Sequence, residues 1–217
     1  MYLIKKKRVL HDSIFLMDIV APRVAKYCQP GQFVIVRIDE LGERIPLTVC
    51  DYDREEGTVT IVVQTVGAST MRMKELNEGE YLHDFVGPLG KPSEFITDNL
   101  EEVKKKKILF VAGGLGTAPV YPQVKWLKDN GIDSDVIVGS KTKDLLILEK
   151  EMEAVAGNLY VTTDDGSVGI KGMVSAALTE EMLREGNYSA VYACGPAPML
   201  NYVKQVSEKL GIQCWLS

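Results

Sequence analysis

The sequence has few of the residues that build metal sites and acid–base sites. Its 217 residues include only two histidines and four cysteines. The cysteines lie far apart without a CxxC pair, unlike the clustered thiolates of zinc and iron–sulfur sites. Neither His11 nor His83 lies in a ligand pattern such as HExxH. The sequence therefore predicts no metal site.

An excess of positive charge and a long apolar segment are also absent. Lys and Arg number 25 against 30 Asp and Glu, a net charge of -5, which disfavours nucleic acid as a partner. The longest uncharged stretch, residues 108–124, is shorter than the roughly 20 residues of a spanning helix. The apolar run at residues 14–17 ends at Asp18 and is too short for a signal-peptide core. We expect a cytoplasmic protein with no membrane span.

The first hundred residues have the pattern of short strands separated by turns, which is typical of an antiparallel barrel or sandwich. One short helix interrupts the pattern at residues 70–76. The expected strands are residues 2–10, 14–20, 33–38, 45–52, 58–64 and 81–86.

From residue 107 onward, strands alternate with segments of helical period, which predicts a parallel sheet with helices on both faces. The expected strands are residues 108–112, 135–138, 159–162, 190–193 and 213–216. The expected helices are residues 119–130, 145–155, 172–185 and 198–210. The polar residues 93–106 form the expected linker, so we predict two domains, residues 1–98 and 99–217.

The segment Gly-Gly-Leu-Gly-Thr-Ala-Pro at residues 113–119 is the strongest local signal. It follows an apolar strand and precedes a helix, where glycines permit a tight turn and helix N–H groups can bind a phosphate. It departs from the usual dinucleotide fingerprint, because Pro119 replaces the third glycine and Ser140-Lys141 stands where an acidic residue is expected. A tight turn that binds nothing is the alternative. The loops at residues 164–167 and 194–199 also follow strands, which favours a nucleotide site.

A second candidate lies in the first half of the chain. Residues 67–70 (Gly-Ala-Ser-Thr) open the short helix and offer another phosphate site at a helix N-terminus. Equally, Ser69 or Thr70 only caps that helix. Residues 44–48 (Arg-Ile-Pro-Leu-Thr) lie in a strand.

Together these motifs resemble the ferredoxin–NADP reductase superfamily, and they occur in its order over nearly the whole chain. The pattern is most similar to the small subunit of NADH-dependent ferredoxin:NADP oxidoreductase (sulfide dehydrogenase), and next to the electron-transfer subunit of dihydroorotate dehydrogenase. The motifs are Val66-Gly67, residues 87–90, 113–119 and 165–167, and Cys194-Gly195-Pro196.

The resemblance implies an N-terminal antiparallel Greek-key β-barrel that binds FAD, followed by a doubly wound parallel α/β domain that binds nicotinamide. It implies a flavoprotein oxidoreductase that passes hydride between NAD(P)H and FAD, and then single electrons to an iron–sulfur or ferredoxin-type partner. The nicotinamide and flavin rings would meet at the domain junction, and that transfer needs no general acid or base. A non-catalytic regulatory or scaffolding subunit of the same fold is the alternative.

The resemblance also assigns residues. It places Thr48 near the flavin N5 and Cys194 beside the nicotinamide, as the catalytic pair. The implied FAD-binding residues are Arg44, Pro46, Leu47, Thr48, Gly67, Ala68, Ser69 and Thr70. For the nicotinamide dinucleotide, it implies Gly114, Gly116 and Thr117 at the pyrophosphate, Asp165 at the adenosine half, and Cys194 and Gly195 beside the nicotinamide.

Two assignments carry specific expectations. A side chain at Gly116 should occupy the phosphate position and leave flavin binding intact. The family's arginine would fall at Ile45, one residue after Arg44. A one-residue shift along a strand places a side chain on the opposite face of the sheet, so the pattern supports the role of Arg44 less strongly than that of Thr48.

The partners follow from the same resemblance. The similar subunits continue into a cysteine-rich segment that binds a [2Fe-2S] cluster, which this sequence does not contain. We expect the cluster in a further C-terminal segment or in a partner, either a larger flavin/iron–sulfur subunit or a ferredoxin. Lys141 and Lys143 would suit the 2′-phosphate of NADPH, whereas the resemblance favours NADH.

Overall fold

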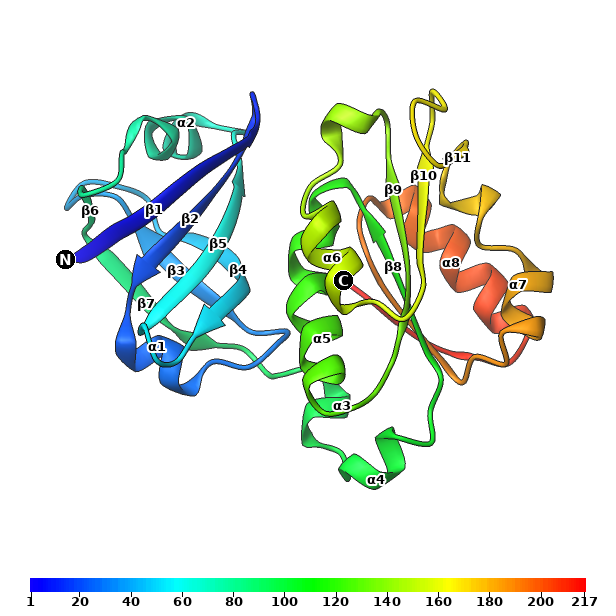
Figure 1. Cartoon of the computed structure of the whole chain (residues 1–217). Coiled ribbons are helices and arrows are strands. Elements are labelled where there is room, and N and C mark those ends of the chain that lie inside the picture. Colours follow the sequence, from blue (N-terminus) through cyan, green and yellow to red (C-terminus); the bar gives the residue numbers. More distant parts are fainter. The chain divides into compact units, whose positions relative to one another are not determined.

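A computed structural model describes all residues, 1–217, and the chain divides into two compact units. The units are Met1–Thr97 and Asp98–Ser217, and each is described by itself (Figure 1).

The first unit is a seven-stranded antiparallel sheet with the strand order β6-β1-β2-β5-β4-β3-β7. Strand β2 pairs with β5 and not with β3, so β2 to β5 form a Greek key. The strands are β1 (Tyr2–His11), β2 (Ile14–Val20), β3 (Phe33–Arg37), β4 (Ile45–Asp53), β5 (Thr58–Gln64), β6 (Tyr81–Leu82) and β7 (Asp84–Leu89); the helices are α1 (Pro22–Tyr27), α2 (Ala68–Glu75) and α3 (Glu94–Thr97).

The sheet curls into a nearly closed barrel. Strands β6 and β7 lie at opposite edges of the sheet, yet only His83 separates them in the chain. The His83 N–H bonds the carbonyls of Arg37 and Ile38 at 3.0 and 3.2 Å. The expected single strand at residues 81–86 is therefore wrong, because the chain crosses between the two edges at His83. The antiparallel Greek-key barrel itself is confirmed.

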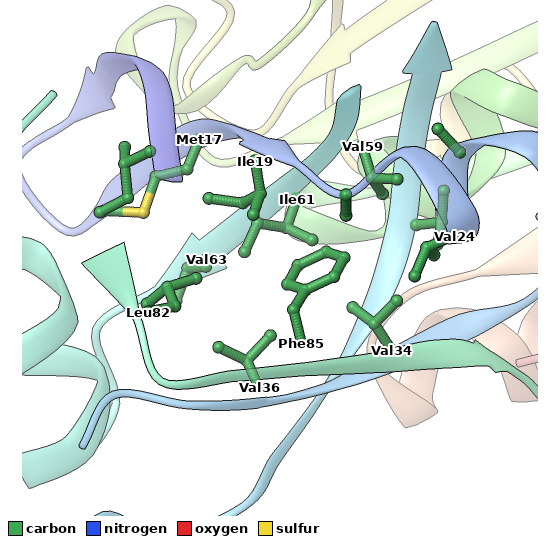
Figure 2. Packing of buried hydrophobic residues seen from close by; sticks show 14 of the residues in the cluster. Met17, Ile19, Val24, Val34, Val36, Val59, Ile61, Val63, Leu82 and Phe85 are labelled. Atoms are coloured by element: carbon green, nitrogen blue, oxygen red, sulfur yellow. The ribbon is translucent and has the colours of Figure 1, made fainter. Parts of the chain in front are cut away.

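Alternating side chains of the barrel strands form its core. Figure 2 shows the Phe85 ring at the centre, with Val34 and Val36 of β3 and Ile61 of β5 around it. Phe85 is only 1% exposed. The unpredicted helix α1 adds Val24 to the same core; it is only six residues long and begins with Pro22.

The second unit is a six-stranded parallel sheet with the order β11-β10-β9-β8-β12-β13. Helices cover both faces, α5 and α6 on one and α7 and α8 on the other (Figure 1). The strands are β8 (Ile108–Gly113), β9 (Asp135–Ser140), β10 (Leu159–Thr163), β11 (Ile170–Lys171), β12 (Ala190–Cys194) and β13 (Gln213–Leu216). The helices are α4 (Leu100–Val103), α5 (Thr117–Asp129), α6 (Glu149–Val155), α7 (Glu180–Glu185) and α8 (Ala197–Lys209), and the 3₁₀ turns are η1 (Gly114–Gly116), η2 (Lys143–Leu145) and η3 (Val174–Ala176).

Strand β8 shows how both faces are buried. Leu109 and Val111 pack in one cluster with residues of α7 and α8. On the opposite face, Phe110 stacks on Tyr192 with 5.4 Å between ring centroids, and Tyr192 stacks on Trp215 at 4.6 Å. This is the alternation that a doubly wound sheet requires, and the predicted α/β fold is confirmed.

Two further expected segments differ from the structure. Residues 93–106 are not an extended linker, because α3 and α4 bury Phe95 and Val103 there. Residues 172–185 are not one helix: η3 ends before Leu178, and α7 starts only after Thr179, whose hydroxyl accepts from the Met182 N–H.

No helix combines the length and hydrophobicity needed to cross a membrane.

We predict that Phe85→Ala destabilises the first unit by about 3–5 kcal/mol, because it leaves a cavity in the centre of the core. The neighbouring Val86→Ala is the control, since Val86 is 50% exposed. Urea unfolding followed by circular dichroism measures both. Equal losses of stability in the two variants would contradict the packing in Figure 2.

Candidate functional site

The loops after β8 and β12 meet where the sheet changes direction. Strand β8 lies between β9 and β12, so the chain proceeds from β8 to one side and later returns to the other. Open α/β sheets bind ligands at such a switch point. Helices α5 and α8 both begin here, so two helix N-termini lie at the same edge of the sheet.

The backbones of these two loops lie in direct contact. A Cβ atom on Gly116 would lie 2.1 Å from the carbonyl oxygen of Cys194. A Cβ on Gly195 would lie 2.7 Å from the Met199 methyl group, and Gly195 has a φ of +159°. Gly116 is therefore required by packing between the loops, whereas a side chain at Gly195 would first displace the flexible end of Met199. That a side chain at Gly116 would occupy the phosphate position and leave flavin binding intact stays a prediction, but the fold itself leaves no room for a side chain there.

The side-chain hydroxyl of this turn is already bonded within the turn, so an anion bound here would have to be held by backbone N–H groups. Thr117 is buried, its hydroxyl donates to the Gly114 carbonyl at 2.9 Å, and its N–H bonds Gly114 and Leu115 carbonyls. The first N–H groups of a helix have no partner within it, and η1 extends α5 backwards. In a 3₁₀ turn the N–H of the third residue, Gly116, bonds the carbonyl of the N-cap Gly113, so the N–H groups without a partner in the turn belong to Gly114 and Leu115. Leu115 is absent from the sequence-based assignment because only the 3₁₀ turn reveals its position.

The loops after β9 and β10 are joined by a serine. The Ser167 hydroxyl donates to Asp165 Oδ1 at 2.7 Å and accepts from the Lys143 N–H at 2.8 Å. The Ser167 N–H also bonds Asp165 Oδ1, at 3.0 Å. The bonds from the Ser167 hydroxyl and N–H lower the pKa of the exposed Asp165. Asp165 therefore presents a fixed, ionised carboxylate at the carboxyl edge of the sheet.

Cys194 ends β12 and is half-buried. Burial raises the pKa of its thiol, so it stays protonated at neutral pH. A neutral thiol is a small packing group beside the turn, not a nucleophile.

In the first unit, the outer face of β4 presents the residues assigned to flavin. Arg44, Pro46 and Thr48 are exposed, whereas Ile45 and Leu47 pack against the barrel core. Arg44 lies just before β4, an even number of residues from Thr48, and side chains an even number of residues apart lie on the same face of a strand. Arg44 is therefore on the same outer face as Thr48, although it lies one residue earlier than the family's arginine. Leu47 points inward, and only its backbone is available on the outer face.

Helix α2 begins two residues before the predicted position, with Gly67 as its N-cap and Ala68 as its first residue. Thr70 Oγ1 accepts from the N–H groups of Val66 and Gly67 at 2.9 and 3.1 Å and donates to the Gly67 carbonyl. All three hydrogen-bonding positions of this hydroxyl are used. Thr70 therefore caps the helix, and an anion at this N-terminus has the backbone N–H groups of the first turn available.

Gly67 differs from every other glycine in the chain. Its φ of -161° is extended backbone that any residue adopts, and a Cβ built on it meets nothing within 4 Å. Each of the other 18 glycines has a left-handed φ, a neighbour inside that distance, or both. Neither φ nor packing requires glycine at this N-cap, although glycine is among the residues favoured there, and a ligand that lies against the backbone would require it.

A hollow of about 390 Å³ lies elsewhere in the second unit, at the amino ends of β9 and β10. Its buried Asp135 is already bonded by the Tyr188 hydroxyl at 2.5 Å and by the Asn158 side chain at 2.8 Å. This is the opposite edge of the sheet from the glycine-rich turns, and none of the sequence motifs falls in it.

Comparisons with known proteins identify the family. The family model described as "Oxidoreductase NAD-binding domain" matches residues 110–205. The dihydroorotate dehydrogenase B (NAD(+)) electron transfer subunit homolog of Thermotoga maritima is 40% identical over 99% of this chain and 73% of its own. The chain belongs to this family of electron-transfer-subunit homologues, within the ferredoxin–NADP reductase superfamily.

Other relatives agree. A Clostridium beijerinckii protein described as "Uncharacterized protein in adh 3'region" is 55% identical over all of this chain and 74% of its own. The solved NADH-dependent reduced ferredoxin-NADP oxidoreductase, studied for flavin-based electron bifurcation, matches with a TM-score of 0.86 and 36% identity, over 100% of this chain and 75% of that one. Phthalate dioxygenase reductase, at 16% identity and a TM-score of 0.75 over 100% and 66% of the two chains, shares the fold. The resemblance read from the motifs is confirmed.

We predict that Gly116→Ala destabilises the second unit by about 3 kcal/mol or more, because the new methyl group meets backbone atoms. Gly114→Ala is the matched control. Gly114 has a φ of +55° but open space around a Cβ, so its cost is about 1–2 kcal/mol. Thermal unfolding of the two variants measures the difference, and the reverse order of stability would refute the contact.

A second prediction concerns the Asp165 carboxylate. Ser167→Ala removes the hydroxyl hydrogen bond that is the largest cause of its lowered pKa, so the pKa of Asp165 should rise towards its ordinary value. Carboxyl ¹³C NMR titration reports it directly. Asp164→Asn, which changes the neighbouring carboxylate, serves as the comparison. An Asp165 pKa unaffected by Ser167→Ala would show that the bond does not form in solution.

Proposed function

We propose that this chain is a flavoprotein electron-transfer subunit. It passes hydride between NAD(H) and FAD and then delivers single electrons to an iron–sulfur or ferredoxin-type partner. The names of its relatives support this: an electron transfer subunit homolog of dihydroorotate dehydrogenase B at 40% identity and a ferredoxin-NADP oxidoreductase at 36%.

Residues 1–98 form the proposed FAD domain. The observation that carries this assignment is Gly67, the one glycine that the fold itself does not require. Its position at the start of α2 suits a pyrophosphate, which would accept hydrogen bonds from the backbone N–H groups of Ala68 and Ser69. Arg44 would neutralise phosphate charge from the exposed side of β4, and Pro46 and Thr48 would face the flavin.

Residues 99–217 form the proposed nicotinamide domain. The turn at residues 114–116 would donate the N–H groups of Gly114 and Leu115 to the dinucleotide pyrophosphate, and Cys194 and Gly195 border the same switch point. Asp165 is suited to accept hydrogen bonds from ribose hydroxyls, because it is fixed and ionised.

The reaction makes modest demands on the side chains. FAD, when bound, supplies the hydride acceptor and divides the electron pair. The protein has to hold the two rings in contact. The neutral Cys194 thiol and the Thr48 hydroxyl provide polar, uncharged contacts at the positions the family assigns to the nicotinamide and to flavin N5. No step of the transfer needs a histidine or a carboxylic acid.

NADH is the proposed nicotinamide substrate. Asp165 would repel the 2′-phosphate of NADPH, and Ser167 keeps its carboxylate in place. Lys141 and Lys143 are exposed and would attract that phosphate, but a lysine is a weaker phosphate discriminator than a bidentate arginine. The proposed electron acceptor carries the [2Fe-2S] cluster, either on a C-terminal extension or on a larger subunit or ferredoxin.

The test is an absorption spectrum of the purified protein before and after anaerobic addition of NADH or NADPH. We predict a flavin spectrum that NADH bleaches faster than NADPH. Gly67→Val should abolish retention of FAD and leave the circular dichroism spectrum unchanged, because the fold has room for the side chain. Gly131→Ala, on a surface turn with open space and a φ of +75°, should retain FAD despite a cost of about 1–2 kcal/mol from the left-handed backbone. The proposal would be refuted if the purified wild-type protein were colourless and did not bind added FAD.

A further inference from the structure

The loop between β3 and β4 carries carboxylates to helix α2. Asp39 forms an ion pair with Arg72 in the middle of α2. Glu43 accepts a hydrogen bond of 2.6 Å from the Ser69 hydroxyl, in the first turn of the helix. An acidic side chain is thus held at the N-terminus that we propose for the FAD pyrophosphate.

Glu43 is not needed to cap this helix. Thr70 already bonds the N–H groups of Val66 and Gly67, and the positive end of the helix dipole favours any nearby anion. Glu43 itself is exposed, and the remaining first-turn N–H groups are left to a ligand. Its carboxylate therefore adds a fixed negative charge beside the position of the ligand phosphate.

This charge affects the two common flavin cofactors unequally. FMN ends in a phosphate monoester, which carries about -1.5 to -2 on one phosphate at pH 7. FAD carries one charge on each phosphate of its pyrophosphate diester, so less charge lies at any one phosphate position. Repulsion by a carboxylate is correspondingly stronger for FMN.

We propose that Glu43 is a specificity-determining residue that disfavours monophosphate flavins at α2 and so selects FAD over FMN. The inference rests on the proposed flavin site and deepens it. Ser69 fixes the carboxylate through its hydroxyl, and Arg44, next in sequence, supplies the attractive charge that either flavin needs.

The decisive variant is Glu43→Gln. Its amide oxygen still accepts from the Ser69 hydroxyl, so the loop keeps its contact and only the charge is lost. The matched control is Glu40→Gln, which removes one charge from the same loop. The Glu40 carboxylate lies 3.9 Å from His83 Nε2 and has no contact with α2 among the ion pairs and hydrogen bonds of the loop.

Titration of the flavin-free protein with FAD and with FMN, followed by quenching of flavin fluorescence, gives both dissociation constants. In Glu43→Gln we expect affinity for FMN to rise about threefold or more relative to FAD. The change should shrink at high salt, because exposed charges are screened. A purely structural role would not produce that salt dependence. Glu40→Gln should leave the ratio unchanged.

The outcomes separate the two proposals. If wild-type protein binds FAD and Glu43→Gln leaves the FMN-to-FAD ratio unchanged, the selectivity role of Glu43 is wrong and the flavin site stands. An equal shift in Glu40→Gln also overturns it, since net charge and not position would then matter. If neither flavin binds the wild-type protein, the proposed function fails, and this inference fails with it.

Discussion

The contact between Gly116 and the carbonyl of Cys194 is the constraint on which the second unit depends. With 2.1 Å between a hypothetical Cβ and that oxygen, only glycine lets the start of α5 lie against the end of β12. That approach brings the first turns of α5 and α8 to one edge of the sheet. In the proposed nicotinamide site, the N–H groups of η1 would bind the phosphate, and no cationic side chain of the turn would be needed to hold it.

The barrel has a comparable constraint at His83. One residue carries the chain from β6 at one edge to β7 at the other, and hydrogen bonds to the end of β3 fix the crossing. Arg37 and Asp84 flank it in a 2.7 Å ion pair, and hydrogen bonds from His83 and Arg37 lower the pKa of Asp84. Closure of the barrel places β4 within the sheet, so alternation along β4 decides which side chains face outward.

The sequence predicted most strands because their apolar residues alternate or run continuously. Strands β2, β5 and β13 have the predicted bounds. The sequence-based prediction was wrong where tertiary packing determines the secondary structure. The helical period at residues 172–185 is present, but Leu178 is buried and Thr179 starts a new helix instead of continuing an old one. The pattern at 81–86 gives no sign that the chain changes edges at His83, because the β3 residue that pairs with the start of β7, Arg37 with Asp84, lies 47 residues earlier (84 − 37 = 47).

The candidate sites also show what the sequence alone does not predict. Glycine-rich motifs identified both loops, yet the sequence did not distinguish Gly116, which packing requires, from Gly67, which it does not. That distinction needs the position of atoms that a Cβ would meet. It also changes what each substitution reports, since a side chain at Gly116 tests folding and one at Gly67 tests ligand binding.

Both proposed phosphate sites consist mainly of backbone N–H groups, which attract any phosphate and discriminate little between one phosphate ester and another. Selectivity must then come from charges placed around them. In each unit a serine hydroxyl holds a carboxylate at 2.6 or 2.7 Å, Ser69 with Glu43 and Ser167 with Asp165. A serine-bound carboxylate has fewer orientations than a free one, so its repulsion acts at a defined position. Such repulsion weakens binding of a ligand that has an additional charge at that position and costs little for a ligand that lacks the charge. In the proposed sites, the additional charge would be the 2′-phosphate of NADPH near Asp165 and the phosphate monoester of FMN near Glu43.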